Sequence, residues 1–420
     1  MKKLFIGTTV VIISLTMTAC VGSEDEFYDD GEDEYCTDGE YEFYDENEDA
    51  FYITWPPLSD ELTAHIKNVM SENNARGLSV AVFEKNGNII YQECFGYRDE
   101  ENKLPVTPDT VFGLASVTKS FTALAVMQLA EKGIIDINKP VSFYIPEFIL
   151  NDEITVLHLM NNTSGIPTQI QYGRNKILVN NIARELGYER EDGDFAFNER
   201  IAEQGAKALT DYLNNIELVG SAGEIYEYTN YGWSLLSEIV RRNSNEPTFP
   251  SYVKKHILEP LDMSRSGGNY IWDDDNVSVL YDEDGNTYDF YHNNVFDMGG
   301  GGMKSTTSDM IKYICMYMNK GTGLNENVII GSEYIDMMTD VSVKIKDNRY
   351  YGLGLVTAPS GAIPRIWHTG GQTGVSSYMV WTLDGELGLI VLCNTRGVDV
   401  GGEIGYSVLK YFYDYLKELS

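Results

Sequence analysis

The placing of strand-like and helix-like segments along the 420 residues most limits the folds open to this chain. Residues 78–83 and 89–95 alternate in character around an Asn-Gly turn, which predicts a β-hairpin. Four further short apolar runs near the other end predict strands: residues 351–357, 365–368, 375–383 and 387–394. Residues from about 134 to 313 are mostly helical in pattern. These positions predict one sheet assembled from distant segments, with a helical insertion between them.

Helical periodicity marks three other segments. Residues 58–74 place Leu62, Ile66 and Val69 on one helix face. A second helix should begin near Ser116 and stop at Gly133, because glycine commonly ends helices. A last amphipathic helix over residues 402–419 should lie on the sheet.

The composition is that of a folded protein without a nucleic-acid surface. The chain is 43% hydrophobic, and its length allows one large domain or two interleaved ones with a sizeable core. A formal net charge of −33 leaves no basic footprint to neutralise phosphates. We therefore expect no nucleic-acid partner.

The first twenty residues read as a targeting segment. Lys2 and Lys3 precede a short apolar run over residues 4–16, which is too short for a comfortable bilayer span. The run leads to small residues and Cys20, a pattern similar to the bacterial lipobox, in which the cysteine is lipidated. An ordinary secretory signal cleaved nearby is the alternative. Either interpretation of residues 1–20 predicts a protein outside the cytoplasm, and the first predicts a lipid anchor on a bacterial membrane.

Residues 21–55 are predicted to form an acidic, disordered tether. Residues 21–50 contain fifteen Asp and Glu and no Lys or Arg, so the segment repels itself and lacks apolar periodicity. It could lift the domain off a surface or act as the interaction module itself. Residues 56–420 are then the folded domain.

The cysteines and histidines show no metal-ligand spacing. Besides Cys20, four cysteines are scattered, and three of them lie in apolar surroundings typical of buried free cysteines. The five histidines form no paired motif. We predict no metal and no cofactor.

The segment Ser116-Val117-Thr118-Lys119 can hold a nucleophile and a base together. Positions i and i+3 share a helix face, so the Lys119 amine can reach the Ser116 hydroxyl. A helix start also supplies N–H groups and a positive dipole end for an oxyanion. On its own, the pattern also fits a polar helix start with an exposed lysine.

Two further motifs follow in order, Tyr228-Thr229-Asn230 and His368-Thr369-Gly370. With Ser116 and Lys119 they resemble the serine β-lactamase and penicillin-binding protein superfamily. The likeness is to the branch that holds class C β-lactamases, D-alanyl-D-alanine carboxypeptidases, D-aminopeptidases and related esterases, and it covers roughly residues 58–418. Residues 157–167 and 301–306 also resemble recurrent family segments. The resemblance implies an α/β (α+β) fold of β-lactamase/transpeptidase type, an antiparallel sheet flanked by helices with a mainly helical lobe.

The resemblance also implies roles for the three catalytic candidates. Ser116 would attack a carbonyl and become acylated, and Lys119 would ease its deprotonation, alone or with Tyr228. Tyr228 would also activate the water that hydrolyses the acyl-enzyme. A phenol becomes a useful base only where a neighbouring cation favours phenolate, and Lys119 can supply that cation.

The remaining candidates would bind substrate. The Asn230 amide can both donate and accept, and could orient a substrate amide and the lysine. His368-Thr369-Gly370 stands where many members have Lys-Thr-Gly, on a strand lining the cleft; Gly370 would let substrate backbone approach, and the N–H of Gly371 would join that of Ser116 in the oxyanion hole. Histidine offers a weaker, pH-dependent charge than lysine, which puts efficient β-lactam hydrolysis in doubt. Asn162 replaces a common family histidine and is interpreted as a packing difference.

The expected function is an extracytoplasmic, membrane-anchored serine hydrolase that works through an acyl-enzyme. Its expected substrates are D-amino-acid peptides such as those of peptidoglycan, β-lactams, or small esters. The alternative is a non-catalytic or slowly deacylating lipoprotein that binds penicillin or cell-wall peptides.

Overall fold

The computed structural model describes residues 55–168, 199–268, 274–288, 298–340 and 342–419. The chain divides into two units, Met1–Thr54 and Trp55–Ser420, and only the second is described. The expected signal segment, Cys20 and almost all of the expected tether therefore lie outside the described residues. Within the described ranges, no helix combines the length and apolar character needed to cross a membrane.

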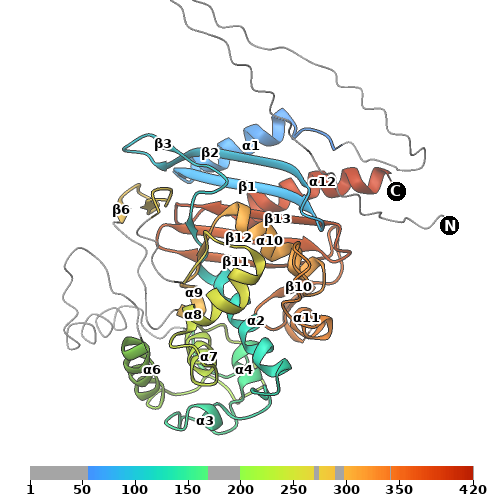
Figure 1. The fold of residues 1–420 in the computed structure, drawn as a ribbon. Helices are drawn as coiled ribbons and strands as arrows, with labels where there is room; N and C mark the ends of the chain where they lie inside the picture. The colour runs from blue at the N-terminus through green and yellow to red at the C-terminus, as the bar shows by residue number, and fades with distance from the viewer. Residues whose placement is uncertain (1–54, 169–198, 269–273, 289–297, 341, 420) are drawn as a thin grey trace, which may run out of the picture. The chain divides into compact units, whose positions relative to one another are not determined.

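An antiparallel sheet of nine strands lies at the centre of this unit, in the order β3-β2-β1-β13-β12-β11-β10-β9-β8 (Figure 1). Its strands are β1 (Gly77–Glu84), β2 (Ile89–Asp99), β3 (Leu104–Pro105), β8 (Val343–Lys346), β9 (Arg349–Tyr351), β10 (Val356–Ala358), β11 (Arg365–Gln372), β12 (Val375–Thr382) and β13 (Leu387–Cys393). β1 pairs with β13 from Leu78↔Cys393 to Glu84↔Leu387. This pairing joins the two ends of the domain, so the predicted sheet from distant segments is confirmed.

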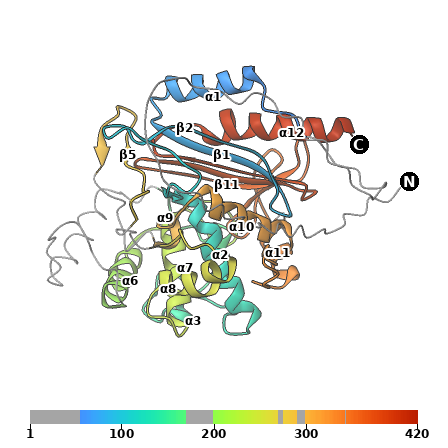
Figure 2. The same ribbon diagram turned by 45° about the horizontal axis from the view of Figure 1, so that its top comes forward.

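Each face of the sheet buries its own apolar cluster. Val80 and Val82 of β1 pack toward helices α1 (Asp60–Glu72) and α12 (Tyr406–Leu419) on one face. Ala81 and Phe83 point to the opposite face, toward α2 (Thr118–Glu131) and α10 (Thr307–Met318). Successive side chains of a strand point to opposite faces, so a strand covered on both sides is apolar throughout. Figure 2 shows α1 and α12 on one side of the sheet and α2 and α10 on the other.

A mainly helical lobe extends from the α2 face. Its helices and turns are η1 (Ala115–Val117), α3 (Val141–Tyr144), α4 (Val156–Met160), α6 (Glu199–Leu213), α7 (Asn230–Arg242), α8 (Phe249–Val253), η2 (Lys254–Leu258), η3 (Glu259–Leu261), α9 (Met298–Gly301) and α11 (Ser332–Thr339); η4 (Val400–Gly405) precedes α12. Two small ladders join β4 (Phe112–Gly113) to β7 (Lys304–Ser305) and β5 (Leu280–Tyr281) to β6 (Thr287–Tyr288). Nearly every residue of α2 is buried, so this helix runs through the lobe as its core.

The turn chemistry of the sequence is mostly confirmed, with one correction. Gly87 and Gly385 adopt positive φ angles of 85° and 74° at the two predicted hairpin turns. The single strand predicted over residues 351–357 is wrong. β9 ends at Tyr351 and β10 begins at Val356, because Gly354 turns the chain at φ 78°, at a point where a Cβ would lie 2.9 Å from the Lys119 carbonyl.

The described cysteines are unpaired, as their surroundings predicted. Cys94, Cys315 and Cys393 form no disulfide, and burial raises the pKa of the Cys315 and Cys393 thiols to about 12. These two thiols therefore behave as small apolar side chains of the core.

Candidate active site

Ser116 lies in a strained turn that delivers its hydroxyl to the start of α2. The residue belongs to η1, directly before Thr118, and is half-buried. Ala115 has a φ of 45°, a conformation that costs a non-glycine residue energy and persists only when its surroundings hold it. β12 supplies part of that hold, because the Ser377 hydroxyl donates to the Leu114 carbonyl at 2.7 Å.

Lys119 is fully buried and its Nζ is surrounded by oxygen atoms. Nζ lies 3.1 Å from Ser116 Oγ, 2.7 Å from Asn230 Oδ1 and 2.7 Å from the Gly300 carbonyl. Three acceptors match the three N–H donors of an ammonium group. The predicted Ser116–Lys119 pair and the predicted Asn230 contact therefore lie together in one site.

Tyr228 completes this group from the side of α7. Lys119 Nζ lies 4.8 Å from the centroid of the Tyr228 ring, close enough for a cation–π contact. Thr229 caps α7, and Asn230 is the first residue of that helix. The short Tyr-Thr-Asn segment thus places a phenol and an amide at one helix start, both beside Lys119.

The glycine-rich segment that contains α9 is tied to α2 by hydrogen bonds. The Thr118 hydroxyl accepts from the Met303 N–H at 3.0 Å, and the Thr122 hydroxyl donates to the Gly299 carbonyl at 2.7 Å. Gly299 is required here, because a Cβ would lie 2.2 Å from the Trp233 carbonyl. These contacts fix the Gly300 carbonyl against Lys119. The sequence shows only that residues 301–306 resemble a recurrent family segment.

His368 is placed near the site, but its ring is turned inward. The side chain is 4% exposed, with Nδ1 2.6 Å from the Thr369 carbonyl and Nε2 3.2 Å from the Tyr351 hydroxyl. A carbonyl only accepts, so the proton is assigned to Nδ1, and Nε2 accepts from Tyr351. Burial, with the Lys119 charge as a second cause, lowers the His368 pKa to about 3. The ring is neutral at ordinary pH.

The two glycines after Thr369 have different surroundings. A Cβ on Gly370 would lie 2.2 Å from the Leu114 carbonyl, so this glycine lets β11 pack against the Ser116 turn. The expectation that Gly370 also lets substrate backbone approach stays a prediction. Gly371 is exposed, and a Cβ there would meet nothing within 4 Å. Thr369 is also exposed; its methyl group faces Gly401 of η4.

Three residues that support the site were not assigned a role in it from the sequence. The Gly300 carbonyl contacts Lys119, and the Tyr351 hydroxyl contacts His368. The buried Asn162 side chain contacts the N–H of Thr229, the residue between Tyr228 and Asn230. The run of glycines over residues 299–302 is a sequence pattern that could have identified Gly300. Tyr351 and Asn162 act across long sequence separations, so no local pattern could have identified them.

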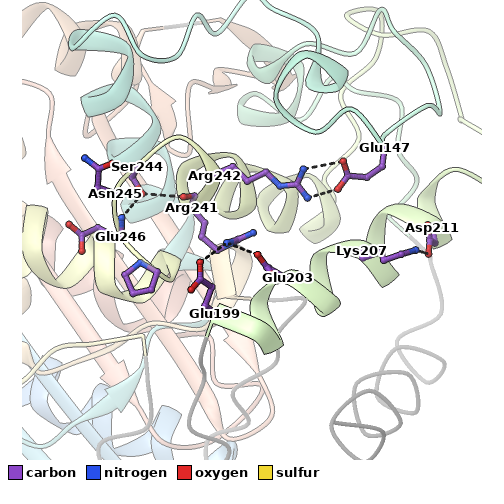
Figure 3. Close-up of a pocket in the computed structure, with 11 residues that line it drawn as sticks. Glu147, Glu199, Glu203, Lys207, Asp211, Arg241, Arg242, Ser244, Asn245 and Glu246 are labelled. Atoms are coloured by element: carbon purple, nitrogen blue, oxygen red, sulfur yellow. Dashed lines mark hydrogen bonds and ion pairs between the residues drawn. The ribbon is translucent and has the colours of Figure 1, made fainter.

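A polar cavity of about 810 Å³ lies away from Ser116, at the other end of α7 (Figure 3). α7 begins at Asn230 in the site and ends at Arg242 beside this cavity. Its arginines are engaged in ion pairs: Arg241 with Glu238 at 2.7 Å, and Arg242 with both Glu238 and Glu147. These pairs hold the end of α7, and the cavity is not part of the Ser116 site.

The comparisons with known proteins concern the family and the fold. The Beta-lactamase family model matches residues 62–409. The Staphylococcus aureus (strain NCTC 8325 / PS 47) relative named Protein flp is 24% identical over 339 residues, 78% of this chain and 61% of its own. PbpX of Bacillus subtilis (strain 168) is 29% identical over 204 residues, which are 48% of this chain and 44% of its own length. The chain thus spans less than two thirds of the length of these curated relatives.

Two solved structures share the fold. The octameric penicillin-binding protein homologue from Pyrococcus abyssi superposes with a TM-score of 0.65 and 26% identity, covering 85% of this chain and 76% of that one. A class C beta-lactamase gives a TM-score of 0.66 at 21% identity, over 83% and 95% of the two chains. The observed fold is therefore the β-lactamase/transpeptidase fold, as the sequence predicted. Because the family model matches most of its length, this chain belongs to the beta-lactamase family, which is part of a superfamily of serine hydrolases.

Proposed function

We propose that this protein is a serine hydrolase that works through an acyl-enzyme, with Ser116 as nucleophile. The observation that carries the proposal is the position of Lys119 Nζ, which bridges Ser116 Oγ at 3.1 Å and Asn230 Oδ1 at 2.7 Å below the Tyr228 ring. Burying a lysine ammonium beside a serine hydroxyl costs free energy unless its charge is compensated by partners that it stabilises. Here the charge favours the alkoxide of Ser116 and the phenolate of Tyr228.

The proposed reaction has two acyl transfers. Ser116 Oγ bonds to the substrate carbonyl carbon, its proton passes to the Lys119–Tyr228 pair, and this proton then moves to the leaving amine or alcohol as its bond breaks. Water repeats the sequence with Tyr228 as base, which releases the acid and restores Ser116–OH. The N–H groups of Ser116 and Gly371 would hold the oxyanion, and the open space at Gly371 is compatible with that role.

The state of His368 bears on the substrate. A neutral, buried ring whose two nitrogens contact Thr369 and Tyr351 offers no positive charge to a substrate carboxylate. Within the expected substrate classes, this favours small esters over substrates that carry a carboxylate, which include β-lactams and D-amino-acid peptides with a free C-terminus. The loops expected to select among them, over about residues 169–205, lie mostly outside the described residues.

We further propose that the domain works outside the cytoplasm on a lipid anchor at Cys20, with residues 21–55 as a tether. The support is in the sequence alone, the apolar run before Cys20 and the fifteen acidic residues after it. Peptidoglycan peptides would then be within reach of the site.

A binding protein that is acylated and deacylates slowly is the second candidate. Its acylation would use the same contacts of Lys119 Nζ with Ser116 and Asn230 as the hydrolase. The two candidates differ in the lifetime of the acyl-enzyme, not in its formation.

Turnover of an activated ester and of a D-alanyl-D-alanine peptide tests the proposal. Wild type should hydrolyse at least one of them, and Ser116→Ala should lose that activity by a factor of about 10³ or more. Ser332→Ala, which changes an exposed serine at the start of α11, is the matched control and should keep it. Turnover that survives in Ser116→Ala would refute the assignment.

A further inference from the structure

Asn162 lies in the loop after α4 in a conformation that suits few residues. Its φ is 57°, in the left-handed region, and its side chain is fully buried. Asparagine is one of the few non-glycine residues that visit this region readily. The residue therefore combines an unusual backbone with a buried polar side chain, which needs partners to be tolerated.

Those partners lie on both sides of Tyr228. The Asn162 carbonyl accepts from the Glu227 N–H at 2.8 Å. Its side-chain Oδ1 accepts from the Thr229 N–H at 3.4 Å and from Trp233 Nε1–H at 3.2 Å. Glu227 and Thr229 are the residues immediately before and after Tyr228. One asparagine thus holds the backbone at both neighbours of the candidate base.

Other contacts make this hold rigid. Trp233 is fully buried in α7, and its carbonyl lies against Gly299, so the indole is a fixed anchor for Oδ1. The loop that carries Asn162 is tied to the same segment again, because the Thr163 carbonyl accepts from the Gly223 N–H at 2.8 Å. The Tyr351 ring packs edge-on against Tyr228, with centroids 6.3 Å apart.

We propose that Asn162 is a positioning residue for Tyr228. By fixing the chain before and after the tyrosine, it keeps the phenol beside Lys119 and Ser116 through both acyl transfers. The inference rests on the proposed function, in which Tyr228 is a base. Misplacement of a catalytic group by 1 Å can cost about 10²-fold in rate, so an error of that size in the Tyr228 backbone should be measurable.

The test is a double-mutant cycle between Asn162→Gly and Tyr228→Phe. Glycine keeps the backbone carbonyl and the positive φ, so the contact with Glu227 is retained while the side-chain contacts, including those of Oδ1, are removed. The Asn162→Gly protein should lose about 10- to 100-fold in kcat on an activated ester, with little change in KM. The rates are expressed per molecule of protein whose Ser116 can be acylated. In the Tyr228→Phe background the same substitution should cost less than about threefold, since its target is gone.

Two variants guard against a purely structural effect. Asn74→Gly changes another asparagine of positive φ, just beyond α1 on the opposite side of the sheet, and should leave kcat unchanged. Asn162→Asp keeps an acceptor oxygen at the Oδ1 position and should retain kcat within about threefold. It also carries the test if the glycine variant does not fold.

Equal losses from Asn162→Gly in both backgrounds would overturn the proposal, as would a folded Asn162→Asp protein that loses kcat like the glycine variant. The proposed function itself fails by another route. If the ester turnover of wild type survives in Ser116→Ala, then Ser116 is not the nucleophile. The double-mutant cycle then no longer reports on a base that acts with Ser116.

Discussion

At the residue scale, Lys119 is the centre of the site. Its Nζ contacts three oxygens from three parts of the chain, namely the Ser116 turn, the start of α7 and the α9 segment. A buried cation with this many acceptors fixes the relative positions of the groups around it, because each contact would leave an unpaired polar group if it moved. The same charge stabilises any anion that forms on Ser116 or Tyr228.

Replacing Lys119 by methionine should therefore abolish acylation while keeping the volume of the side chain. We expect the rate of acylation by an activated ester to fall by about 10³-fold or more, since both charge and proton transfer are lost. Stopped-flow detection of the leaving group measures this rate. Lys132→Met, at the exposed end of the same helix, should acylate at the wild-type rate; an equal loss there would show that the assay reports folding instead.

The buried His368 makes stability depend on pH. Its pKa of about 3 is below the ordinary value of 6.5, so the unfolded chain binds a proton more readily. This contribution to stability is complete above about pH 6.5 and is lost as the pH falls toward 3. At pH 4 the loss is on the order of 3 kcal/mol.

Urea unfolding of wild type and His368→Gln at pH 7 and pH 4 measures this effect. The glutamine variant should lose less free energy of unfolding than wild type between the two pH values. Equal losses in both proteins would contradict the neutral, buried assignment of His368.

At the element scale, β11 packs against η1, the turn that carries Ser116. Gly370 touches the Leu114 carbonyl, and Gly371, its neighbour, faces open space. Alternation along a strand explains the contrast, since adjacent residues point to opposite faces. Only one glycine of the pair is needed for the strand to reach the Ser116 turn.

The adjacent variants Gly370→Ala and Gly371→Ala separate these roles. Gly370→Ala should destabilise the fold by about 1–3 kcal/mol and lower the rate of acylation, because the strand must move off the turn. Gly371→Ala should leave the melting temperature nearly unchanged while altering KM or kcat for the ester. Thermal unfolding and ester kinetics on both proteins check this; a Gly371→Ala protein as unstable as Gly370→Ala would contradict it.

How far the sequence could predict these features depends on the range of the contacts involved. The hairpins at Gly87 and Gly385 and the Ser116–Lys119 pair are local, so spacing and turn chemistry predict them. The ordered motifs predicted that Tyr228 and Asn230 would join that pair. The inward turn of His368 and the contacts of Asn162 depend on residues far away in the chain, and no local pattern contains them.

At the scale of the whole domain, its two ends meet on the α1 and α12 face of the sheet. Trp55, the first described residue, packs against Phe412 and Tyr415 of α12, with ring centroids 6.1 and 6.0 Å away. The Tyr411 hydroxyl donates to the Pro57 carbonyl at 2.9 Å. The Ser116 site lies on the other face of the sheet, at the start of α2. Changes at the chain ends should therefore lower the stability of the fold more than the rate of the reaction.

A variant that begins at Trp55 should accordingly keep the wild-type kcat/KM and melting temperature. A variant that begins at Asp60 removes the Trp55 and Pro57 contacts and should melt several degrees lower, with kcat/KM still within about threefold at a temperature where it is folded. Calorimetry and ester kinetics provide both values. A large loss of kcat/KM on removing residues 1–54 would show that the acidic segment takes part in catalysis.

The central claim is that Ser116 becomes covalently acylated, and intact-protein mass spectrometry tests it most directly. Wild type and Ser116→Ala would be incubated with a fluorescent penicillin and with an activated ester, then digested to locate any adduct. We predict an added acyl mass on wild type alone, on the peptide that contains Ser116, with a lifetime that distinguishes a hydrolase from a slowly deacylating binder. An adduct of equal yield on Ser116→Ala, or located at another residue, would contradict the account.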